Sequence, residues 1–512
     1  MNAIVVLGAG PAGAAAAMGL RRLGYPVTLV SEWRRFSALE GISQRVLEAL
    51  RAAGLQRAVA DAVLPSQRQV AWNGQQHAQN IEWLLDRPCF DRGLREDMRL
   101  AGVDVIEARV LAVASSTTGH RISLEGREPL QADFLVEARG RQAPTVGKGL
   151  RGPETVSLLN RWQATPGHTA SAVESLAQGW AWMARRADGQ CYWQWTVDVA
   201  SAELPGKAQL LEYCHQQRMA SPLARAFFAD SGQHDVQLHA RSSTAILNPQ
   251  VCGENWIRVG DAAMAVDPLS GNGIFQSLSS ALQAPAVINT LLRKPERAAL
   301  ARRFHQQRVE QLFMRFARIG RDFYAEEQRW AQQPFWAARR HWPDSQIAHA
   351  EVDFAALRIA RAPVLRDGFV DEAEVVISPD QPLGIWHVQG IEVAPVLRRL
   401  QAEPAQNVLA ARSVDVMHLG EMQPERDHDL QSDISYPVSY RGRMGRDART
   451  GGFFSFRLKS ADGPLVLQAS YWGEERNRDF YILVDGVRIA RVTPRFSAAT
   501  GLPASAISLH RR

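Results

Sequence analysis

The chain has 512 residues, of which 46% are hydrophobic and 22% are charged. This composition is that of an ordinary globular protein of roughly two to four domains, and it excludes a disordered or fibrous chain. The formal net charge of +6 comes almost wholly from arginine, but no basic run is interleaved with aromatic residues, so we expect no nucleic-acid partner.

The cysteines and the apolar stretches indicate the compartment. The four cysteines form no CxxC pair and no cluster with zinc spacing, so we predict no metal site and a reducing cytoplasm. Ala3–Leu20 is apolar and rich in alanine, like a signal peptide, but no Lys or Arg precedes it. No other stretch is long and apolar enough to span a bilayer, so we expect a cytoplasmic protein without a membrane partner.

The first predicted elements form a βαβ unit. Ala3–Leu7 is a short, wholly apolar and β-branched run, which predicts a buried parallel strand. Ala12–Leu23 is predicted to be an alanine-rich helix, and Pro26–Val30 the next strand. Together they span about 30 residues, which is the usual length of such a unit.

Shorter elements follow up to residue 154. Gly41–Ala53 has helical spacing, with Ser43 near its start, and Phe90–Leu100 is a further predicted helix. Strands are expected at Val70–Trp72, at Ile81–Leu85, within Val103–Val113, at Ile122–Leu124 and at Phe134–Val136.

The pattern changes after residue 154. Residues 155–239 alternate apolar and polar side chains and contain many tryptophans, which predicts an antiparallel sheet suited to walling a substrate pocket. Ser277–Leu292 and Pro295–Trp330 are predicted helices, and 339–412 is less regular. Beyond Asp415, strands are expected at Gly452–Leu458, Pro464–Trp472 and Asp479–Leu483, with an Asp-Gly hairpin turn in Val484–Val487.

These patterns predict an α/β protein with a Rossmann-type dinucleotide-binding domain, an interleaved antiparallel sheet, a helical segment and a C-terminal all-β domain. We place the last boundary near Arg412. The expected domains are 1–154 and 241–293 for the two parts of the dinucleotide-binding domain, 155–240 for the substrate-binding sheet, 294–412 for the helical or irregular segment and 413–512 for the β domain.

A glycine fingerprint lies between the first strand and the first helix. In Gly8-Ala9-Gly10-Pro11-Ala12-Gly13, the first glycine allows a tight turn, the second lets a pyrophosphate approach the backbone, and the third lets helix and strand pack. The helix N-terminus offers free N–H groups to phosphate. Glu32 follows about 20 residues on, where a carboxylate can accept ribose hydroxyls. The motif predicts dinucleotide binding; an alanine-rich buried helix with incidental glycines is the alternative.

A second motif lies near residue 260. Trp256–Ala263 is a predicted strand followed by Gly260-Asp261, and Asp267–Gly273 is a loop that precedes a long helix. Over roughly residues 1–400 the chain resembles the hydroxylase-type FAD family, which includes aromatic hydroxylases and flavin-dependent halogenases. The resemblance implies that Asp261 holds the ribityl chain of FAD. It also implies that the loop presents backbone N–H groups to the pyrimidine end of the flavin, through Pro268, Gly271, Asn272 and Gly273.

Further positions match this family less specifically. Arg87, in Asp86–Asp91, resembles an arginine that contacts FAD, Arg45 resembles another arginine near the cofactor, and Val110 lies where the backbone meets adenine. A surface arginine or a core valine is the alternative for each. Phe134–Arg141 departs from the family's Asp-Ala-x-Gly element by carrying Glu137 and Arg139, which affects the predicted contacts with FAD and with NAD(P)H.

Two features test a resemblance to flavin-dependent tryptophan halogenases. These enzymes carry a Trp-x-Trp motif at a position comparable with Trp193-Gln194-Trp195, but here Thr-Val-Asp replaces their Ile-Pro ending. They also need an early lysine to receive hypohalous acid. The first lysine here is Lys148, and arginine cannot replace it because it does not deprotonate. Packing within a strand is the alternative role of both tryptophans.

A looser resemblance is to flavoproteins that modify peptidyl tryptophan in quinone-cofactor biogenesis, through the Asp267–Phe275 loop and the arginine-rich helical segment after it. It implies an FAD-dependent monooxygenase that uses NADH or NADPH and oxygen to hydroxylate an electron-rich aromatic ring. The expected partner is an aromatic small molecule, such as an indole, or a peptide or protein. A halogenase-like enzyme and a non-oxygenating FAD reductase or dehydrogenase are the alternatives. No catalytic residue is predicted, because the flavin carries the chemistry.

The C-terminal segment has its own pattern, in Pro424–His428, Arg446–Phe456, Ser470–Gly473 and Asp479–Gly486. It resembles the accessory β-sandwich domain of arabinofuranosidase-type glycoside hydrolases. No paired carboxylates with catalytic spacing are recognisable, so we infer a binding or packing role and not hydrolysis. A glycan- or partner-binding protein with a structural flavin is therefore a further hypothesis.

We predict that FAD is bound noncovalently, because no cysteine or histidine lies in a motif for flavin attachment. Acid precipitation should release yellow FAD into the supernatant, measured by its visible absorbance. A flavin that stays with the precipitated chain would contradict the prediction.

Overall fold

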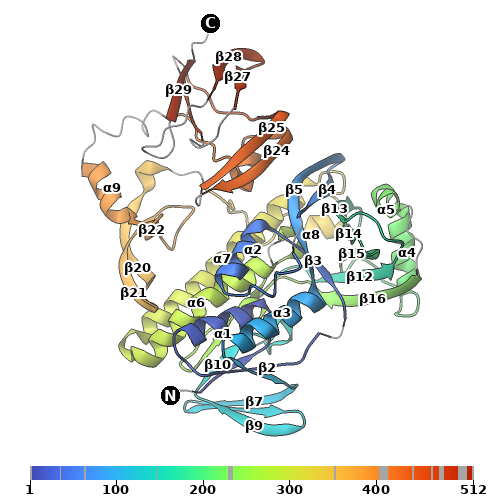
Figure 1. Cartoon of the computed structure of the whole chain (residues 1–512), viewed down its shortest axis with the longest axis vertical. Helices are drawn as coiled ribbons and strands as arrows, with labels where there is room; N and C mark the ends of the chain where they lie inside the picture. Colours follow the sequence, from blue (N-terminus) through green and yellow to red (C-terminus); the bar gives the residue numbers. More distant parts are fainter. Residues whose placement is uncertain are drawn as a thin grey trace. The chain divides into compact units, whose positions relative to one another are not determined.

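The computed structural model describes residues 3–34, 36–62, 65–145, 147–228, 234–271, 273–350, 353–402, 413–440, 443–462, 465–471, 478–493 and 504–509 (Figure 1). The chain divides into two compact units, Met1–Arg398 and Arg399–Arg512. The boundary predicted near Arg412 lies outside the described residues.

A parallel sheet organises the first unit. Its strand order is β18-β10-β1-β2-β6, and all four neighbouring pairs are parallel. The predicted βαβ unit is confirmed, since α1 (Pro11–Arg22) connects β1 to β2. The strand bounds are Ile4–Leu7 for β1, Val27–Ser31 for β2, Asp104–Glu107 for β6, Phe134–Glu137 for β10 and Trp256–Arg258 for β18.

Burial on both faces explains why β1 is wholly apolar. Ile4 and Val6 belong to the core formed with α1 and the other helices, whereas Val5 and Leu7 pack against a separate three-stranded antiparallel sheet. Such a strand has no solvent face and therefore no polar alternation. The other helices of this layer are α2 (Gln44–Ala52), α3 (Arg87–Leu100) and α6 (Gly273–Arg293); the small sheet consists of β7 (Val110–Ser116), β8 (Gly119–Leu124) and β9 (Arg127–Ala132).

A second, mostly antiparallel sheet has the order β16-β12-β15-β14-β13-β4-β5-β3. It joins strands from both sides of residue 154, because β4 pairs in parallel with β13. The antiparallel pairing predicted for residues 155–198 is present in the structure, although the strands β12, β14 and β15 are buried along most of their length and do not alternate between buried and exposed residues. The bounds are Leu39–Ile42 (β3), Pro65–Trp72 (β4), Gln75–Asp86 (β5), Thr155–Gln163 (β12), Ala170–Leu176 (β13), Gly179–Arg185 (β14), Gln190–Asp198 (β15) and His234–Ser242 (β16).

Three predicted elements need correction. The expected sheet is interrupted by α4 (Leu210–Ala220) and α5 (Pro222–Phe227), whose residues cover one face of β15. Gly41 and Ile42 lie in β3 and not in a helix, because they pair with β5. The segment predicted as irregular contains a long hairpin of β20 (Arg358–Arg366) and β21 (Phe369–Ile377), whose Asp367-Gly368 turn has positive φ at both residues.

The helical region after residue 293 is confirmed by α7 (Ala298–Glu326), which packs against α6 and is followed by α8 (Pro334–Arg339). Within the part of the chain that the structure describes, no helix has the length and apolarity needed to cross a membrane.

The second unit is rich in β structure. Its described residues form three antiparallel pairs, and the Asp485-Gly486 turn predicted from sequence connects β27 to β28, with φ of 48° and 79°. The β-sandwich stays a prediction. The pairs are β24 (Gln431–Tyr440) with β25 (Arg443–Ser455), β26 (Leu465–Ser470) with β29 (Ala504–Leu509), and β27 (Phe480–Val484) with β28 (Val487–Val492).

We predict that a chain ending at residue 412 retains FAD, because both large sheets and all predicted flavin positions lie within the first unit. Size-exclusion chromatography should show a folded protein with the same FAD-to-protein ratio as the full chain. Insoluble, flavin-free protein would mean that the second unit completes the core of the first.

Candidate active site

The glycine fingerprint lies at the carboxyl edge of the parallel sheet. The turn from β1 to α1 has β2 on one side and β10 on the other, so it lies where the strand order reverses direction. Ligands of open α/β sheets bind at this kind of switch point. The α1 N-terminus also lacks a side-chain cap, because Gly10 is its N-cap residue, and Pro11 occupies the first turn.

The three glycines have different roles. Gly8 has φ of +106°, and a Cβ there would lie 2.4 Å from the carbonyl oxygen of Ala138. A Cβ on Gly13 would lie 1.9 Å from the Gly8 carbonyl oxygen. A Cβ on Gly10 would meet nothing within 4 Å. Gly8 and Gly13 therefore permit close packing within the protein, whereas Gly10 leaves open space of the kind that a pyrophosphate needs.

The second motif lies against the first. After β18, Gly260–Ala262 forms a short 3-10 helix (η2), and Gly260 has φ of +60°. A Cβ on Gly260 would lie 2.7 Å from the Ala12 side chain, so the two chain segments touch. The Gly260 N–H donates to Ser280 Oγ of α6 at 2.8 Å. This contact places Asp261 beside the open turn.

Asp261 can accept further hydrogen bonds. Its carboxyl accepts from Ser277 Oγ at 3.3 Å and lies 3.7 Å from Arg141 Nε, while 35% of its side chain is exposed. Burial raises the pKa of Asp261, and the positive charge of Arg141 offsets part of this shift. Arg141 is held in turn by the backbone carbonyls of Thr244 and Val266. Sequence reasoning missed Arg141 and Ser277, because their proximity to Asp261 is purely tertiary.

Glu137 and Arg139, which depart from the family's Asp-Ala-x-Gly element, form an ion pair with each other. Arg139 Nε donates to Glu137 Oε1 at 2.9 Å, and the Arg139 backbone N–H donates to the same oxygen at 3.1 Å. The two unusual charges thus neutralise each other at the end of β10. The next residue, Gly140, has φ of +64° and lies beside Asp261, so the backbone still turns at the site.

Arg87 is buried at the first turn of α3. It donates to Glu40 Oε1 at 2.9 Å and to Asp91 Oδ1 at 2.8 Å. Burial lowers the pKa of its guanidinium, but the two carboxylates outweigh this and raise it. The charge of Glu40 raises the pKa of Asp261 and the charge of Arg87 lowers it, both less than burial and Arg141 do.

The remaining predicted positions lie further apart. Glu32 follows β2, with a half-exposed side chain 3.9 Å from Arg109 Nε. Arg45 is exposed in the first turn of α2. Val110 begins β7 and packs against the core beneath β1 and β2. Their contacts with FAD stay predictions.

The segment Asp267–Gly273, here called the flavin loop after its predicted contacts with FAD, ends at Gly273, the first residue of α6. Pro268–Ser270 forms a 3-10 turn (η3) capped by Asp267, whose side chain accepts from the Leu269 N–H at 2.9 Å. Gly271 has φ of +62°, and a Cβ on Gly271 or Gly273 would meet nothing within 4 Å. Asn272 lies outside the described residues. The open space at both glycines fits a flat ring packed against the backbone.

An aromatic cluster packs against this loop. Leu269 packs against a group of side chains from β4, β13, β14, α7 and α8 and the segment between the two helices. The Trp193-x-Trp195 pair is elsewhere: both rings are buried against α4 and α5, so these residues have the packing role. The cluster comprises Trp180, Tyr324, Phe335 and Trp336, with partly buried Trp72, Val173, Trp182 and Trp330 beside Leu269.

Gly10→Val should abolish FAD binding without unfolding the flavin-free chain, because the side chain would enter open space at a φ of −70°. Asp261→Ala should also lose FAD, by removing an acceptor for sugar hydroxyls. FAD content is measured by absorbance, and melting temperature by circular dichroism. Gly8→Ala is the matched control: it should destabilise the flavin-free chain itself, because its Cβ would clash. Full flavin content in Gly10→Val would refute this placement of the pyrophosphate.

Known proteins share this architecture. Residues 1–312 match the family described as FAD binding domain, and residues 408–509 match a family of unknown function, DUF6805. The solved structure of the peptidyl tryptophan dihydroxylase QhpG, described as essential for tryptophylquinone cofactor biogenesis, is 64% identical. It superposes with a TM-score of 0.73 and covers 80% of this chain and 95% of that chain.

More distant relatives share the fold. The flavin-dependent halogenase CmlS has a TM-score of 0.63 at 16% identity, over 81% of this chain and 94% of that chain. The tryptophan 2-halogenase of Chondromyces crocatus is 24% identical over 68% of this chain and 71% of the relative. The arabinofuranosidase-type resemblance of the C-terminal segment stays a prediction. The predicted FAD cofactor is confirmed: this chain belongs to the FAD binding domain family and is an FAD-dependent oxidoreductase of the monooxygenase type.

Proposed function

We propose that this protein hydroxylates a tryptophan side chain within a peptide or protein, with NADH or NADPH as the source of electrons. The observation that carries the proposal is the 64% identity to a peptidyl tryptophan dihydroxylase along 95% of that chain. The tryptophan 2-halogenase is only 24% identical, which favours hydroxylation over halogenation.

The aromatic cluster beside the flavin loop supports an aromatic substrate. Trp72, Trp182 and Trp330 pack against the same cluster as Leu269, and none of the three is fully buried. Aromatic rings pair favourably in offset or edge-to-face arrangements, which suits an incoming indole. The cluster also presents little polar surface, which helps to exclude water from a reacting ring.

The chain's own part in the reaction is binding and orientation. Bound FAD supplies two-electron transfer and the activation of dioxygen. Gly10 leaves room for its pyrophosphate, Asp261 offers an acceptor to the sugar chain, and the flavin loop offers backbone space to the ring. Holding the indole at reacting distance can lower the barrier by roughly 7–11 kcal/mol.

The lysine pattern also supports hydroxylation. A halogenase must trap a diffusing oxidant with a nucleophilic amine beside the substrate. The first lysine, Lys148, is exposed in the segment before β11 (Leu150–Arg151), and the aromatic cluster contains no lysine among its described members. A hydroxylase has no need of such an amine.

We expect the FAD-loaded protein to add one or two oxygen atoms to a tryptophan-containing peptide in the presence of NAD(P)H and oxygen. Tandem mass spectrometry should place the added mass on the indole, and ¹⁸O₂ should label it. Controls omit the reductant or use a peptide with phenylalanine in place of tryptophan.

The same assay with excess chloride or bromide separates the two candidate reactions. A product that gains halogen mass would overturn the hydroxylase proposal in favour of a halogenase. Consumption of NAD(P)H with no modified peptide or free indole in any arm would instead favour a reductase.

A further inference from the structure

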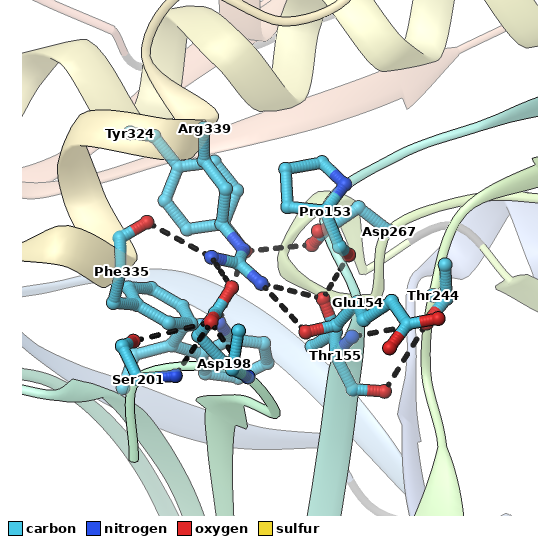
Figure 2. A network of polar contacts seen from close by, with 12 residues as sticks. Pro153, Glu154, Thr155, Asp198, Ser201, Thr244, Asp267, Tyr324, Phe335 and Arg339 are labelled. Atoms are coloured by element: carbon cyan, nitrogen blue, oxygen red, sulfur yellow. Dashed lines mark hydrogen bonds and ion pairs between the residues drawn. The ribbon is translucent and has the colours of Figure 1, made fainter.

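One carboxylate anchors the start of the flavin loop. Asp267 Oδ1 accepts the Leu269 backbone N–H at 2.9 Å, which shapes the 3-10 turn from within. The same oxygen accepts the Tyr324 hydroxyl at 2.8 Å, which ties the turn to helix α7 (Figure 2). The hydrogen bond from Leu269 is local capping, whereas the hydrogen bond from Tyr324 joins residues that are 57 positions apart in the sequence.

Tyr324 also connects the turn to the second, mostly antiparallel sheet. Its hydroxyl oxygen accepts the Trp180 Nε1–H of β14 at 3.2 Å, and the residue is only 2% exposed. Because an indole N–H can only donate, the hydroxyl must give its own proton to Asp267. The hydrogen bonds thus run in one direction from Trp180 through Tyr324 to Asp267.

The Tyr324 ring packs against two aromatic rings of helix α8. Tyr324 packs edge-on against Phe335 and Trp336, with ring centroids 5.6 and 5.8 Å apart. Helix α8, which carries both rings, is fixed by Arg339, whose guanidinium donates to Asp198 at 3.0 Å and to Thr155 Oγ1 at 2.7 Å (Figure 2). Arg339 is 2% exposed, so a change in the cluster would disturb a buried ion pair.

Two contacts between described residues attach the flavin loop to the aromatic cluster. Leu269 makes the apolar contact, and Asp267 makes the polar contact through Tyr324. The loop glycines contribute no side chains of their own, and a Cβ at Gly271 or Gly273 would meet open space. The Tyr324–Asp267 hydrogen bond is therefore a polar contact that ties the loop to the cluster.

We propose that Tyr324 is a positioning residue, which fixes the flavin loop against the aromatic cluster through Asp267 and so sets the distance between the flavin and the substrate ring. The inference rests on the proposed function for its activity readout. Loss of the hydroxyl should leave FAD bound but misplace the ring, and a misplacement of about 1 Å can cost a hundredfold in rate. NAD(P)H would then be consumed with release of hydrogen peroxide in place of hydroxylated peptide.

Tyr324→Phe tests this proposal, because it keeps the buried ring and removes only the hydroxyl. We expect an unchanged FAD content and peptide KM, a roughly tenfold lower yield of hydroxylated product per NAD(P)H consumed, and matching hydrogen peroxide release. The visible circular dichroism of the bound flavin should change as well. Tyr25→Phe is the matched control: that hydroxyl is also buried and donates to Asn289 Oδ1 at 2.8 Å, in the helical core.

A second pair of variants tests Asp267, which accepts the Tyr324 hydrogen bond. Asp267→Asn keeps an oxygen for both the Leu269 N–H and the Tyr324 hydroxyl, so it should retain most of the coupling. Asp267→Ala removes both contacts and should uncouple the reaction at least as strongly as Tyr324→Phe. Rescue by asparagine would distinguish positioning from a need for the negative charge.

The outcomes distinguish failure of the positioning role of Tyr324 from failure of the proposed hydroxylase function. If the unmodified protein hydroxylates the peptide and Tyr324→Phe keeps both its coupling and its flavin dichroism, Tyr324 is an ordinary core residue and the inference is wrong. If the unmodified protein hydroxylates no peptide, the proposed function fails, and the dichroism alone decides: a change in Tyr324→Phe but not in Tyr25→Phe supports the positioning role, and no change in either refutes it.

Discussion

Close backbone approach at the carboxyl edge of the parallel sheet is the constraint on which the site depends. Gly8 lies against Ala138, Gly13 against Gly8, and Gly260 against Ala12, each closer than a side chain would permit. These contacts bring the ends of β1, β10 and β18 together. Only then can the helix N-terminus, Asp261 and the turn at Gly140 border the predicted cofactor site. Of the three glycines in the fingerprint, Gly10 is the one that faces open space.

Ion pairs between arginine and acidic side chains are the second feature of the site. The arginines around the site each have an acidic neighbour: Arg87 contacts Glu40 and Asp91, Arg139 contacts Glu137, and Arg141 lies near Asp261. An uncompensated buried charge is strongly destabilising, so Glu40 and Asp91 allow Arg87 to be buried beside the predicted cofactor site, whereas the side chains of Arg139 and Arg141 stay partly exposed. They also explain how the chain tolerates Glu137 and Arg139 where its family carries a different element.

The sequence determined the cofactor-binding half of the protein to a large extent, because those signals are local. The apolar β1 strand, the glycine turn and the following helix are contiguous, and the spacing of the motif has a direct physical meaning. The Asp485-Gly486 hairpin was predictable for the same reason. The Asp367-Gly368 hairpin carries the same local signal, but the residues around it lack a regular pattern. The sequence around Gly41 favours a helix, because the strand β5 with which it pairs is remote in sequence.

Tertiary structure alone decided which distant side chains meet. Arg141 reaches Asp261 across 120 residues, and Tyr324 reaches both Trp180 and Asp267. The tryptophan-rich strands likewise gave no indication that Trp193 and Trp195 pack against α4 and α5 while Trp180 faces the flavin loop. Sequence patterns show periodicity along one helix or strand. These contacts depend instead on how separate elements pack, because the residues that face a given side chain are determined only when the sheets and helices assemble.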